Sequence, residues 1–408
     1  MCDTAPKNFV PVPFRYHENV ELRVCDINNL GVGIGRISDW VAMVPSVCID
    51  EVVIARVYKN CKNYSLADLV EILSPSSDRV SPRCSLFGIC GGCQYQHMSY
   101  NKQVELKRHH VSDVMKRIGN IDTIVNNCIC DGKKCYGYRS KITPHYQKKV
   151  PPIGFLDRSS RKIVDVESCP IATHAINNEI SNARNRLIQK SHDLKRGGTL
   201  LLRDVGRDVG NKVVFDHNEK VEEVVNGYRF RFIAGEFFQN NPFLLPRFAE
   251  FVVQSAVGPT NLIDAYCGVG FFGILAASSF DNIVGIEVNK NAIKLAKENA
   301  EMNGVGNISF ISGVAEKIFD NVNFNGNSTS VIIDPPRAGC DAKFLDQLLN
   351  FCPEKIVYVS CAPDTQARDL KILSQKYDAV EIQPFDMFPQ TRHIENVVVL
   401  RKRKDDLI

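Results

Sequence analysis

The chain has 408 residues and a net charge of +4, and 44% of its residues are apolar. This length predicts two or three domains, and because no apolar run is long enough to cross a membrane we expect a protein without membrane spans. Residues 1–14 mix acid, base and proline and lack the apolar stretch of a signal peptide, which predicts a cytoplasmic location. In that compartment the fifteen cysteines favour metal binding or catalysis over a disulfide framework.

Residues 8–74 predict a small all-β unit. Short β-branched runs, such as residues 20–24 and 52–57, alternate with turn residues. Residues 30–36 contain glycine at every second position, as a bulge or a barrel corner requires. Five short strands in a segment of this length fit a barrel of the oligonucleotide-binding type.

A cysteine motif follows the serine- and proline-rich linker at residues 74–83. Cys84, Cys90 and Cys93 form the pattern C-x5-C-x2-C, whose spacing is typical of metal ligands. Cys169 is the candidate for a fourth ligand, because a proline follows it as it often follows the last cysteine of a cluster motif. Three further cysteines compete for this role on sequence alone: Cys128, Cys130 and Cys135. The spacing leaves zinc and an iron–sulfur cluster as alternatives.

Positive charge is concentrated between residues 102 and 162, which hold fourteen Lys and Arg and five Asp and Glu, a local net charge of +9. This concentration favours a polyanionic partner, and a charged face that only contacts water is an equal alternative. In the same region Tyr138, Arg139 and Lys141 interleave aromatic and basic side chains. That pattern suits stacking on bases and neutralising phosphates, so it predicts a contact with RNA.

From residue 248 onward strands and helices alternate, which predicts a doubly wound α/β domain. A predicted strand at residues 262–266 leads into the string G-x-G-x-x-G at residues 268–273, and the next strand ends in Glu287. Glycines let the backbone approach a nucleotide, and an acid about twenty positions further on can bind ribose hydroxyls. This string by itself favours a nicotinamide enzyme. The third strand, however, ends in the rigid turn that begins with Asp334, which favours the adenosyl cofactor of a methyltransferase.

Two reactive side chains follow in the last part of the domain. A predicted strand at residues 355–361 ends in Cys361, and a motif at residues 386–396 places Glu395 just before the last apolar run. In open α/β sheets the carboxyl ends of the strands form the edge where ligands bind. A thiolate there can attack an electron-poor carbon, and a carboxylate can accept a proton. Taken singly, Cys361 also fits a small buried apolar residue, and Glu395 a surface charge.

Together these segments resemble the RNA uridine-C5 methyltransferase family, which acts on 23S ribosomal RNA and transfer RNA, over almost the whole chain. Residues 30–36 and 76–79 are similar to a TRAM domain, and residues 84–94 with Cys169 are similar to the family's four-cysteine [4Fe–4S] site. Residues 237–241, 266–270 and 334–337 are similar to its cofactor-contacting motifs. Residues 359–363 match the nucleophile motif, and residues 386–395 match the terminal motif that carries the base.

The resemblance implies two cofactors, S-adenosylmethionine and a [4Fe–4S] cluster. The residues it implies for the cluster are Cys84, Cys90, Cys93 and Cys169. The residues it implies for S-adenosylmethionine are Gln239, Tyr266, Phe271, Glu287 and Asp334. Phe271 stands where related enzymes often carry Asn, and Ala362 replaces a common Asn after the nucleophile.

The resemblance also implies a mechanism in which Cys361 adds to C6 of uracil, C5 takes the methyl group, and Glu395 removes the C5 proton. The expected substrate is 23S ribosomal RNA, with transfer RNA second, and the expected state is a monomer. Two alternatives remain from the residues themselves. A nicotinamide oxidoreductase explains only the glycine string with Glu287, and a metal-stabilised RNA-binding protein without activity explains only the front half.

The predicted organisation has three parts. Residues 1–78 form a TRAM-type, OB-like β-barrel that binds RNA. Residues 79–245 form a central α+β iron–sulfur and RNA-binding domain, whose helix near residues 100–118 is expected to pack on the catalytic domain. Residues 246–408 form a Rossmann-like methyltransferase domain.

Overall fold

The computed structural model describes residues 4–159, 161–206, 210–313, 319 and 322–403. They divide into two compact units. The first unit comprises the chain up to Leu106 together with Phe155–Asp165 and Pro389–Arg392, and the second comprises Lys107–Gly154, Val166–Phe388 and the chain from His393 onward. Each unit is described by itself below.

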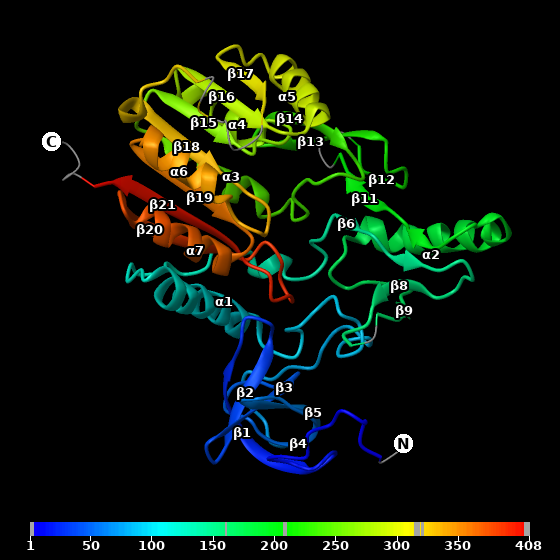
Figure 1. The fold of residues 1–408 in the computed structure, drawn as a ribbon. Coiled ribbons are helices and arrows are strands. Elements are labelled where there is room, and N and C mark those ends of the chain that lie inside the picture. The colour runs from blue at the N-terminus through cyan, green and yellow to red at the C-terminus, as the bar shows by residue number, and fades with distance from the viewer. Residues whose placement is uncertain (1–3, 160, 207–209, 314–318, 320–321, 404–408) are drawn as a thin grey trace. The chain divides into compact units, whose positions relative to one another are not determined.

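The first unit contains a closed five-stranded barrel, as the sequence predicted (Figure 1). Around the barrel the strands follow the order β1-β2-β3-β5-β4, with bounds β1 (Asn19–Ile27), β2 (Val32–Ile37), β3 (Trp40–Pro45), β4 (Val52–Asn60) and β5 (Tyr64–Ser74). Alternate side chains point inward and form an apolar core that includes Val24, Val44 and Val53. A Cβ added at Gly33 or Gly35 would overlap neighbouring side chains, so only glycine fits these two positions.

The second unit is built on a seven-stranded sheet of order β17-β16-β15-β18-β19-β21-β20 (Figure 1). Its neighbouring strands pair in parallel except at β21, which is antiparallel to both β19 and β20. The bounds are β15 (Asn261–Ala265), β16 (Asn282–Glu287), β17 (Ile308–Ser312), β18 (Thr329–Ile333), β19 (Lys355–Ser360), β20 (Tyr377–Phe385) and β21 (Glu395–Lys402). This is the predicted doubly wound α/β fold with one reversed strand near the edge.

Helices cover both faces of this sheet, which explains why its central strands β18 and β19 are almost entirely buried. Three helices contribute to one apolar core, namely α3 (Leu245–Ala256), α4 (Phe271–Leu275) and α5 (Lys290–Met302). Two contribute to the other, namely α6 (Ala342–Phe351) and α7 (Pro363–Leu373). Successive residues of one strand enter opposite cores, as Ile332 and Ile333 of β18 do.

Helix α1 (Tyr100–Val114) ends in a π-helical turn, Met115–Gly119, as the predicted helix at residues 100–118 required. Its residues Val111 and Met115 belong to the same apolar core as α6 and α7. α2 (His174–Gln189) begins at Thr173, whose hydroxyl accepts a hydrogen bond from the Ile176 N–H.

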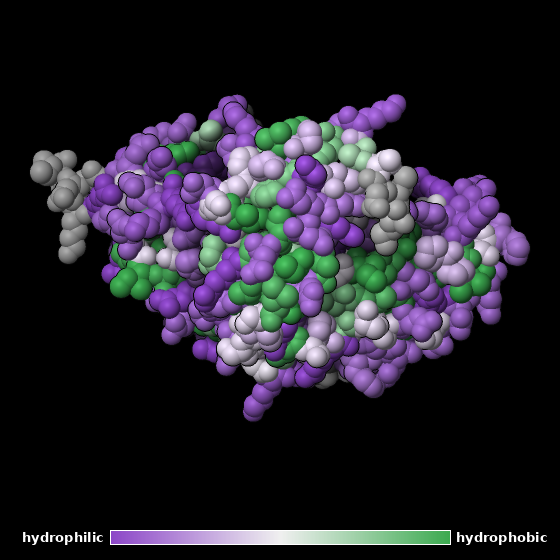
Figure 2. Space-filling model, turned by 90° about the horizontal axis from the view of Figure 1, so that it is seen from below, coloured by the Kyte–Doolittle hydropathy of each residue, from purple (hydrophilic) through white to green (hydrophobic). Residues whose placement is uncertain are grey.

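The remaining strands of the second unit are short. They form antiparallel pairs, and their bounds are β6 (Lys141–Ile142), β7 (His145–Tyr146), β8 (Ile153–Leu156), β10 (Gly198–Thr199), β11 (Leu202–Val205), β12 (Lys212–Val214), β13 (Lys220–Val225) and β14 (Tyr228–Ile233). β9 (Ile163–Asp165) lies in the first unit. Within the described residues, no helix is long and apolar enough to cross a membrane. The face of the molecule shown in Figure 2 is largely hydrophilic, with smaller apolar areas between the polar ones.

Candidate active site

The carboxyl ends of four neighbouring parallel strands bring the predicted residues to one edge of the sheet. β15 ends before Tyr266, β16 ends in Glu287, β18 ends before Asp334 and β19 ends before Cys361. β15 and β18 are adjacent in the sheet, and each is flanked by one of the other two. The edge therefore combines the predicted cofactor side with the predicted nucleophile.

Glu395 reaches the same edge because β21 runs in the opposite direction. The register pairs Ser360 of β19 with Asn396 of β21. Continuing this antiparallel register by one residue places Cys361, which follows Ser360, opposite Glu395, which precedes Asn396. The structure thus places side by side two residues that are 34 positions apart in the sequence.

A pair of buried amides holds these two segments together. Asn396 Nδ2 donates to Gln366 Oε1 at 2.7 Å, and Gln366 Nε2 donates to the carbonyl oxygen of Tyr358 at 2.8 Å. Gln366 lies on α7, directly after the nucleophile, and Tyr358 lies on β19 before it. The two amides therefore fix β21, which begins at Glu395, to β19 and α7 on either side of Cys361.

Burial raises the pKa values of the acidic side chains in this site and so favours their neutral forms. Glu395 is 4% exposed, and burial together with the nearby Asp334 raises its pKa well above the ordinary range. Burial, then Glu395 and Asp334, raise the pKa of Cys361 to about 11. Burial raises the pKa of Asp334 to about 7. These shifts favour the thiol form of Cys361 and the neutral carboxyl form of Glu395.

Arg337 opposes these shifts, a role that the sequence motif did not reveal. Its positive charge lowers the pKa of both Cys361 and Glu395, and its side chain also hydrogen-bonds the Cys361 thiol. Its backbone is fixed to α7, because Thr365 Oγ1 donates to the Arg337 carbonyl at 3.1 Å. A cation placed between a thiol and a carboxyl group favours the charged form of either one.

The loop after β15 has the geometry expected of a nucleotide-binding turn. Tyr266 has a positive φ of 64°, rare for a residue with a side chain, and a Cβ at Gly268 would meet open space. The Gly268 N–H donates to Glu287 Oε2 at 3.2 Å, so Glu287 anchors this loop. Phe271 packs against Phe230 with ring centroids 5.1 Å apart, which makes it an apolar contact residue.

Asp264 was not singled out from the sequence and proves to be completely buried beneath this loop. Its Oδ2 accepts a hydrogen bond from the Gly273 N–H of α4 at 2.8 Å, while its Oδ1 has no hydrogen-bond partner among the described residues. Burial is the main cause that raises its pKa to about 7, and Asp334 and Glu287 add to the effect. An acid inside the apolar run of residues 262–265 was the available sequence signal.

Gln239 lies in the segment after β14 and lines a small cavity of about 20 Å³. Its neighbour Phe238 meets Phe271 edge to face, with ring centroids 5.6 Å apart. This contact brings the segment that carries Gln239 beside the loop after β15. Arg203 stabilises the segment, donating to the carbonyl oxygens of Ala234 at 2.9 Å and Phe238 at 3.2 Å.

The three cysteines of the C-x5-C-x2-C motif lie on one short segment of the first unit. Burial, followed by the Cys84 charge, raises the pKa of Cys90, whereas Arg158 lowers it. The Arg158 side chain donates to the Cys93 carbonyl at 3.1 Å. Cys169 belongs to the second unit, where its backbone N–H donates to Asn177 Oδ1 at 2.8 Å.

All described cysteines are free, and the described part of the chain holds no group of three or more Cys, His, Asp or Glu side chains arranged to bind a metal. The iron–sulfur site therefore has no geometric support here, and it stays a prediction from sequence.

The predicted RNA contact at residues 138–141 is wrong for Tyr138 and stays a prediction for Arg139 and Lys141. Tyr138 is completely buried, so its ring cannot stack on a base. Lys141 is half-buried, and its Nζ donates to the carbonyl oxygens of Gly235 at 2.7 Å and Glu236 at 2.9 Å. Residues 138, 140 and 142 are buried whereas residues 139 and 141 are partly exposed, because alternate positions of an extended segment point to opposite sides.

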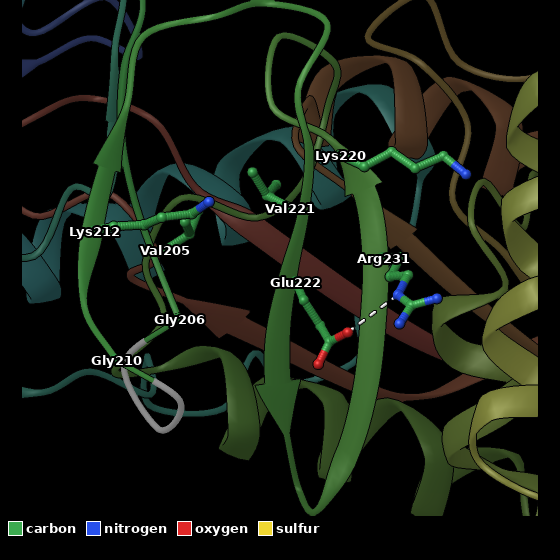
Figure 3. A pocket seen from close by; sticks show the side chains of 8 residues that line it. All are labelled: Val205, Gly206, Gly210, Lys212, Lys220, Val221, Glu222 and Arg231. Carbon is green, nitrogen blue, oxygen red and sulfur yellow. Dashed lines mark hydrogen bonds and ion pairs between the residues drawn. The ribbon is translucent and has the colours of Figure 1, made fainter.

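A larger hollow of about 530 Å³ lies between the β11–β12 and β13–β14 pairs and contains none of the predicted site residues (Figure 3). Its charged side chains pair with acids. Arg231 Nε lies 3.1 Å from Glu222 Oε2, and Lys212 Nζ lies 2.6 Å from Glu219 Oε1. With these charges neutralised, the hollow does not have the properties of an anion site.

The seven-stranded sheet with its reversed strand, glycine turn and acidic strand ends defines an S-adenosylmethionine-dependent methyltransferase. A family model described as tRNA (uracil-5-)-methyltransferase matches residues 171–403. The chain belongs to this family and is an RNA uracil-C5 methyltransferase. Membership excludes both alternatives, the nicotinamide oxidoreductase and the non-catalytic RNA-binding protein.

Relatives and a solved structure match nearly the whole chain. The tRNA (uracil(54)-C(5))-methyltransferase of Schizosaccharomyces pombe is 37% identical, over 96% of this chain and 80% of its own length. The Saccharomyces cerevisiae protein of the same name is 31% identical, over 96% of this chain and 75% of its own length. The crystal structure of Pyrococcus abyssi tRNA (uracil-54, C5)-methyltransferase in complex with S-adenosyl-L-homocysteine has a TM-score of 0.74 and 26% identity. The structural match covers 93% of this chain and 100% of the Pyrococcus abyssi chain.

Proposed function

We propose that this enzyme methylates C5 of uridine 54 in transfer RNA through a covalent adduct on Cys361. The observation that carries the chemistry is the placement of Cys361 opposite Glu395 at the sheet edge, beside Asp334 and Arg337. The names of the relatives support transfer RNA, so they reverse the preference for 23S ribosomal RNA that the sequence motifs gave.

The chemical difficulty is that C5 of uracil is a weak nucleophile, and covalent catalysis divides the reaction into easier steps. Bound S-adenosylmethionine supplies an electrophilic methyl group. The Cys361 thiolate forms a bond to C6, and the displaced π electrons make C5 enolate-like. After C5 has taken the methyl group, Glu395 accepts the C5 proton, the Cys361–C6 bond breaks, and the thiolate is restored.

The raised pKa values give each group a role in this sequence. Arg337 favours the Cys361 thiolate that burial and the two carboxyl groups disfavour. Burial and Asp334 favour the protonated form of Glu395, whereas Arg337 favours the ionised form that can act as the base. Once ionised it is a strong base, because the same burial that raises its pKa makes proton uptake favourable.

The cofactor residues are proposed from the family resemblance and from the position of Tyr266, Glu287 and Asp334 at the sheet edge. Gln239, Tyr266, Phe271, Glu287 and Asp334 would surround S-adenosylmethionine, with Phe271 as an apolar rather than a polar contact. A target base inside folded RNA must leave its stack to reach Cys361. The five-stranded barrel, which we propose to be a TRAM domain, would contribute to holding the RNA.

The [4Fe–4S] cluster on Cys84, Cys90, Cys93 and Cys169 is proposed from the cysteine spacing together with the resemblance to the family's four-cysteine site. No step of the reaction depends on it. Anaerobically purified enzyme should be brown and contain iron and acid-labile sulfide. A colourless anaerobic preparation with stoichiometric zinc would refute the cluster. A monomeric state and a cytoplasmic location are proposed with it, and they can be checked by light scattering and by microscopy of a tagged protein.

The substrate is tested with purified enzyme, radiolabelled S-adenosylmethionine and RNA transcripts. Transfer RNA should accept label, and the same transcript with cytidine at position 54 should not. Equal labelling of the two transfer RNAs would refute the position, and label confined to a 23S fragment would refute the substrate class. Mapping 5-methyluridine in total RNA of a deletion strain tests the same question in the cell, because the modification should be missing at position 54 of transfer RNA.

A further inference from the structure

The loop between β20 and β21 is buried although it has no regular secondary structure. Asp386, Met387 and Thr391 are completely buried, and Gln390 is 2% exposed. Loops usually run over the surface, because their backbone polar groups need partners. This loop ends at Glu395, so whatever holds it also sets the position of the proposed base.

Lys107 of α1 provides the first anchor. Its Nζ lies 2.5 Å from Asp386 Oδ1 and donates to the carbonyl oxygen of Phe388 at 3.0 Å. Both charged side chains are completely buried. Replacing a buried ion pair by apolar residues is often neutral or stabilising, so stability alone does not account for this pair. Its geometric effect is to fix the loop at two points.

Further anchors lie on either side. Asn241 Nδ2 donates to the Met387 carbonyl at 3.1 Å. Gln103, four residues before Lys107 and hence on the same face of α1, exchanges two hydrogen bonds with Gln390. The Gln390 N–H donates to Gln103 Oε1 at 3.1 Å, and Gln103 Nε2 donates to Gln390 Oε1 at 3.0 Å. Gln390 has a positive φ of 67°, a conformation that these bonds help to hold.

The strand pairing transmits the position of the loop to the base. Phe385, the last residue of β20, pairs directly with Glu395, the first residue of β21. Asp386 follows Phe385, and its backbone N–H donates to the Ile129 carbonyl at 2.8 Å. A shift at Asp386 therefore moves the chain on which Glu395 is held opposite Cys361.

We propose that Lys107 is a positioning residue for the proton-abstraction step, acting through the buried Lys107–Asp386 pair on Glu395. The proposal rests on the proposed role of Glu395 as the base. Lys107 does not contact the reacting atoms, so its loss impairs the step that uses Glu395 and spares cofactor binding and methyl transfer. A displacement on the order of 1 Å can slow a step about a hundredfold.

The test is Lys107→Met, which keeps the length of the side chain and removes its charge. Wild-type enzyme, Lys107→Met and Glu395→Gln are incubated with transfer RNA and methyl-labelled S-adenosylmethionine, then separated on a denaturing gel. Lys107→Met should turn over about 10- to 100-fold more slowly and accumulate a labelled protein–RNA band, as Glu395→Gln does. Its KM for S-adenosylmethionine should stay within about twofold. Lys297→Met, which changes an exposed lysine on α5, is the matched control and should behave as wild type.

Two controls show whether the Lys107 variant is folded. The first is its binding of S-adenosylhomocysteine, and the second is a double variant. Lys107→Met with Asp386→Leu leaves no unpaired buried charge and should fold, yet it should keep the slow release of the adduct. If Glu395→Gln forms no labelled band, the proposed function fails. If Glu395→Gln forms it and a folded Lys107 variant does not, the positioning role alone is overturned. Failure of both Lys107 variants to fold would assign the pair to stability and would also overturn the proposal.

Discussion

Asp264 makes the stability of the second unit depend on pH in a direction opposite to that of a carboxylate paired with a cation. Its pKa is raised from 3.8 to about 7, chiefly by burial. Between these two values the folded chain binds a proton that the unfolded chain has lost. The contribution of Asp264 to stability is therefore fully present below about pH 4 and is lost as pH rises towards 7.

Asp264→Asn removes this titration while keeping an oxygen that can accept the Gly273 N–H. A shift of about three pKa units corresponds to about 4 kcal/mol. Relative to wild type, the variant should gain about 2 kcal/mol at pH 5 and about 4 kcal/mol at pH 8.5, on top of an offset that is the same at every pH. The offset arises because the amide nitrogen replaces an oxygen that has no partner in the described structure.

The assay is thermal unfolding followed by circular dichroism from pH 5 to pH 8.5. With about 2–4 °C per kcal/mol, the difference in Tm between variant and wild type should grow by roughly 4–8 °C over this range. Asp346→Asn, which removes an exposed carboxylate on α6, gives the effect of charge loss without burial. A difference in Tm that does not change with pH, or that shrinks as pH rises, would refute the reasoning.

Three further predictions concern catalysis and the barrel. Cys361→Ala should abolish both methyl transfer and the covalent band on a denaturing gel, whereas Glu395→Gln should accumulate methylated adduct. A fully active Cys361→Ala enzyme would exclude the thiolate mechanism. Arg337 lowers the pKa of the Cys361 thiol, so Arg337→Met should shift the pH dependence of Cys361 alkylation to higher pH. Mass spectrometry of the Cys361 peptide measures the extent of alkylation at each pH. A pH dependence that does not change would contradict the contact. Gly35→Val should destabilise the barrel by about 1–3 kcal/mol, because a Cβ there overlaps a core side chain. Urea unfolding followed by fluorescence of Trp40, the only tryptophan, measures this, and an unchanged midpoint would contradict the packing.

Local sequence determined the elements of this protein. Alternating β-branched residues predicted the barrel, and alternating strands and helices predicted the doubly wound sheet, because each pattern reflects which faces must be buried. The parallel strands also predicted the shared edge of Asp334 and Cys361, since their carboxyl ends point the same way. Family motifs then assigned the chemistry to residues that, taken singly, fit ordinary core or surface positions.

Tertiary structure alone decided which side chains face one another. Tyr138 matched an exposed RNA-binding pattern and is buried, while Asp264 and Arg337 gained their importance only from the groups packed around them. Lys107 lies 279 positions from the aspartate that it binds. Periodicity records whether a residue is inside, but not which distant residue meets it there. For buried charges that partner determines pKa, geometry and function, because in a low dielectric the nearest charged or hydrogen-bonding groups dominate the energy.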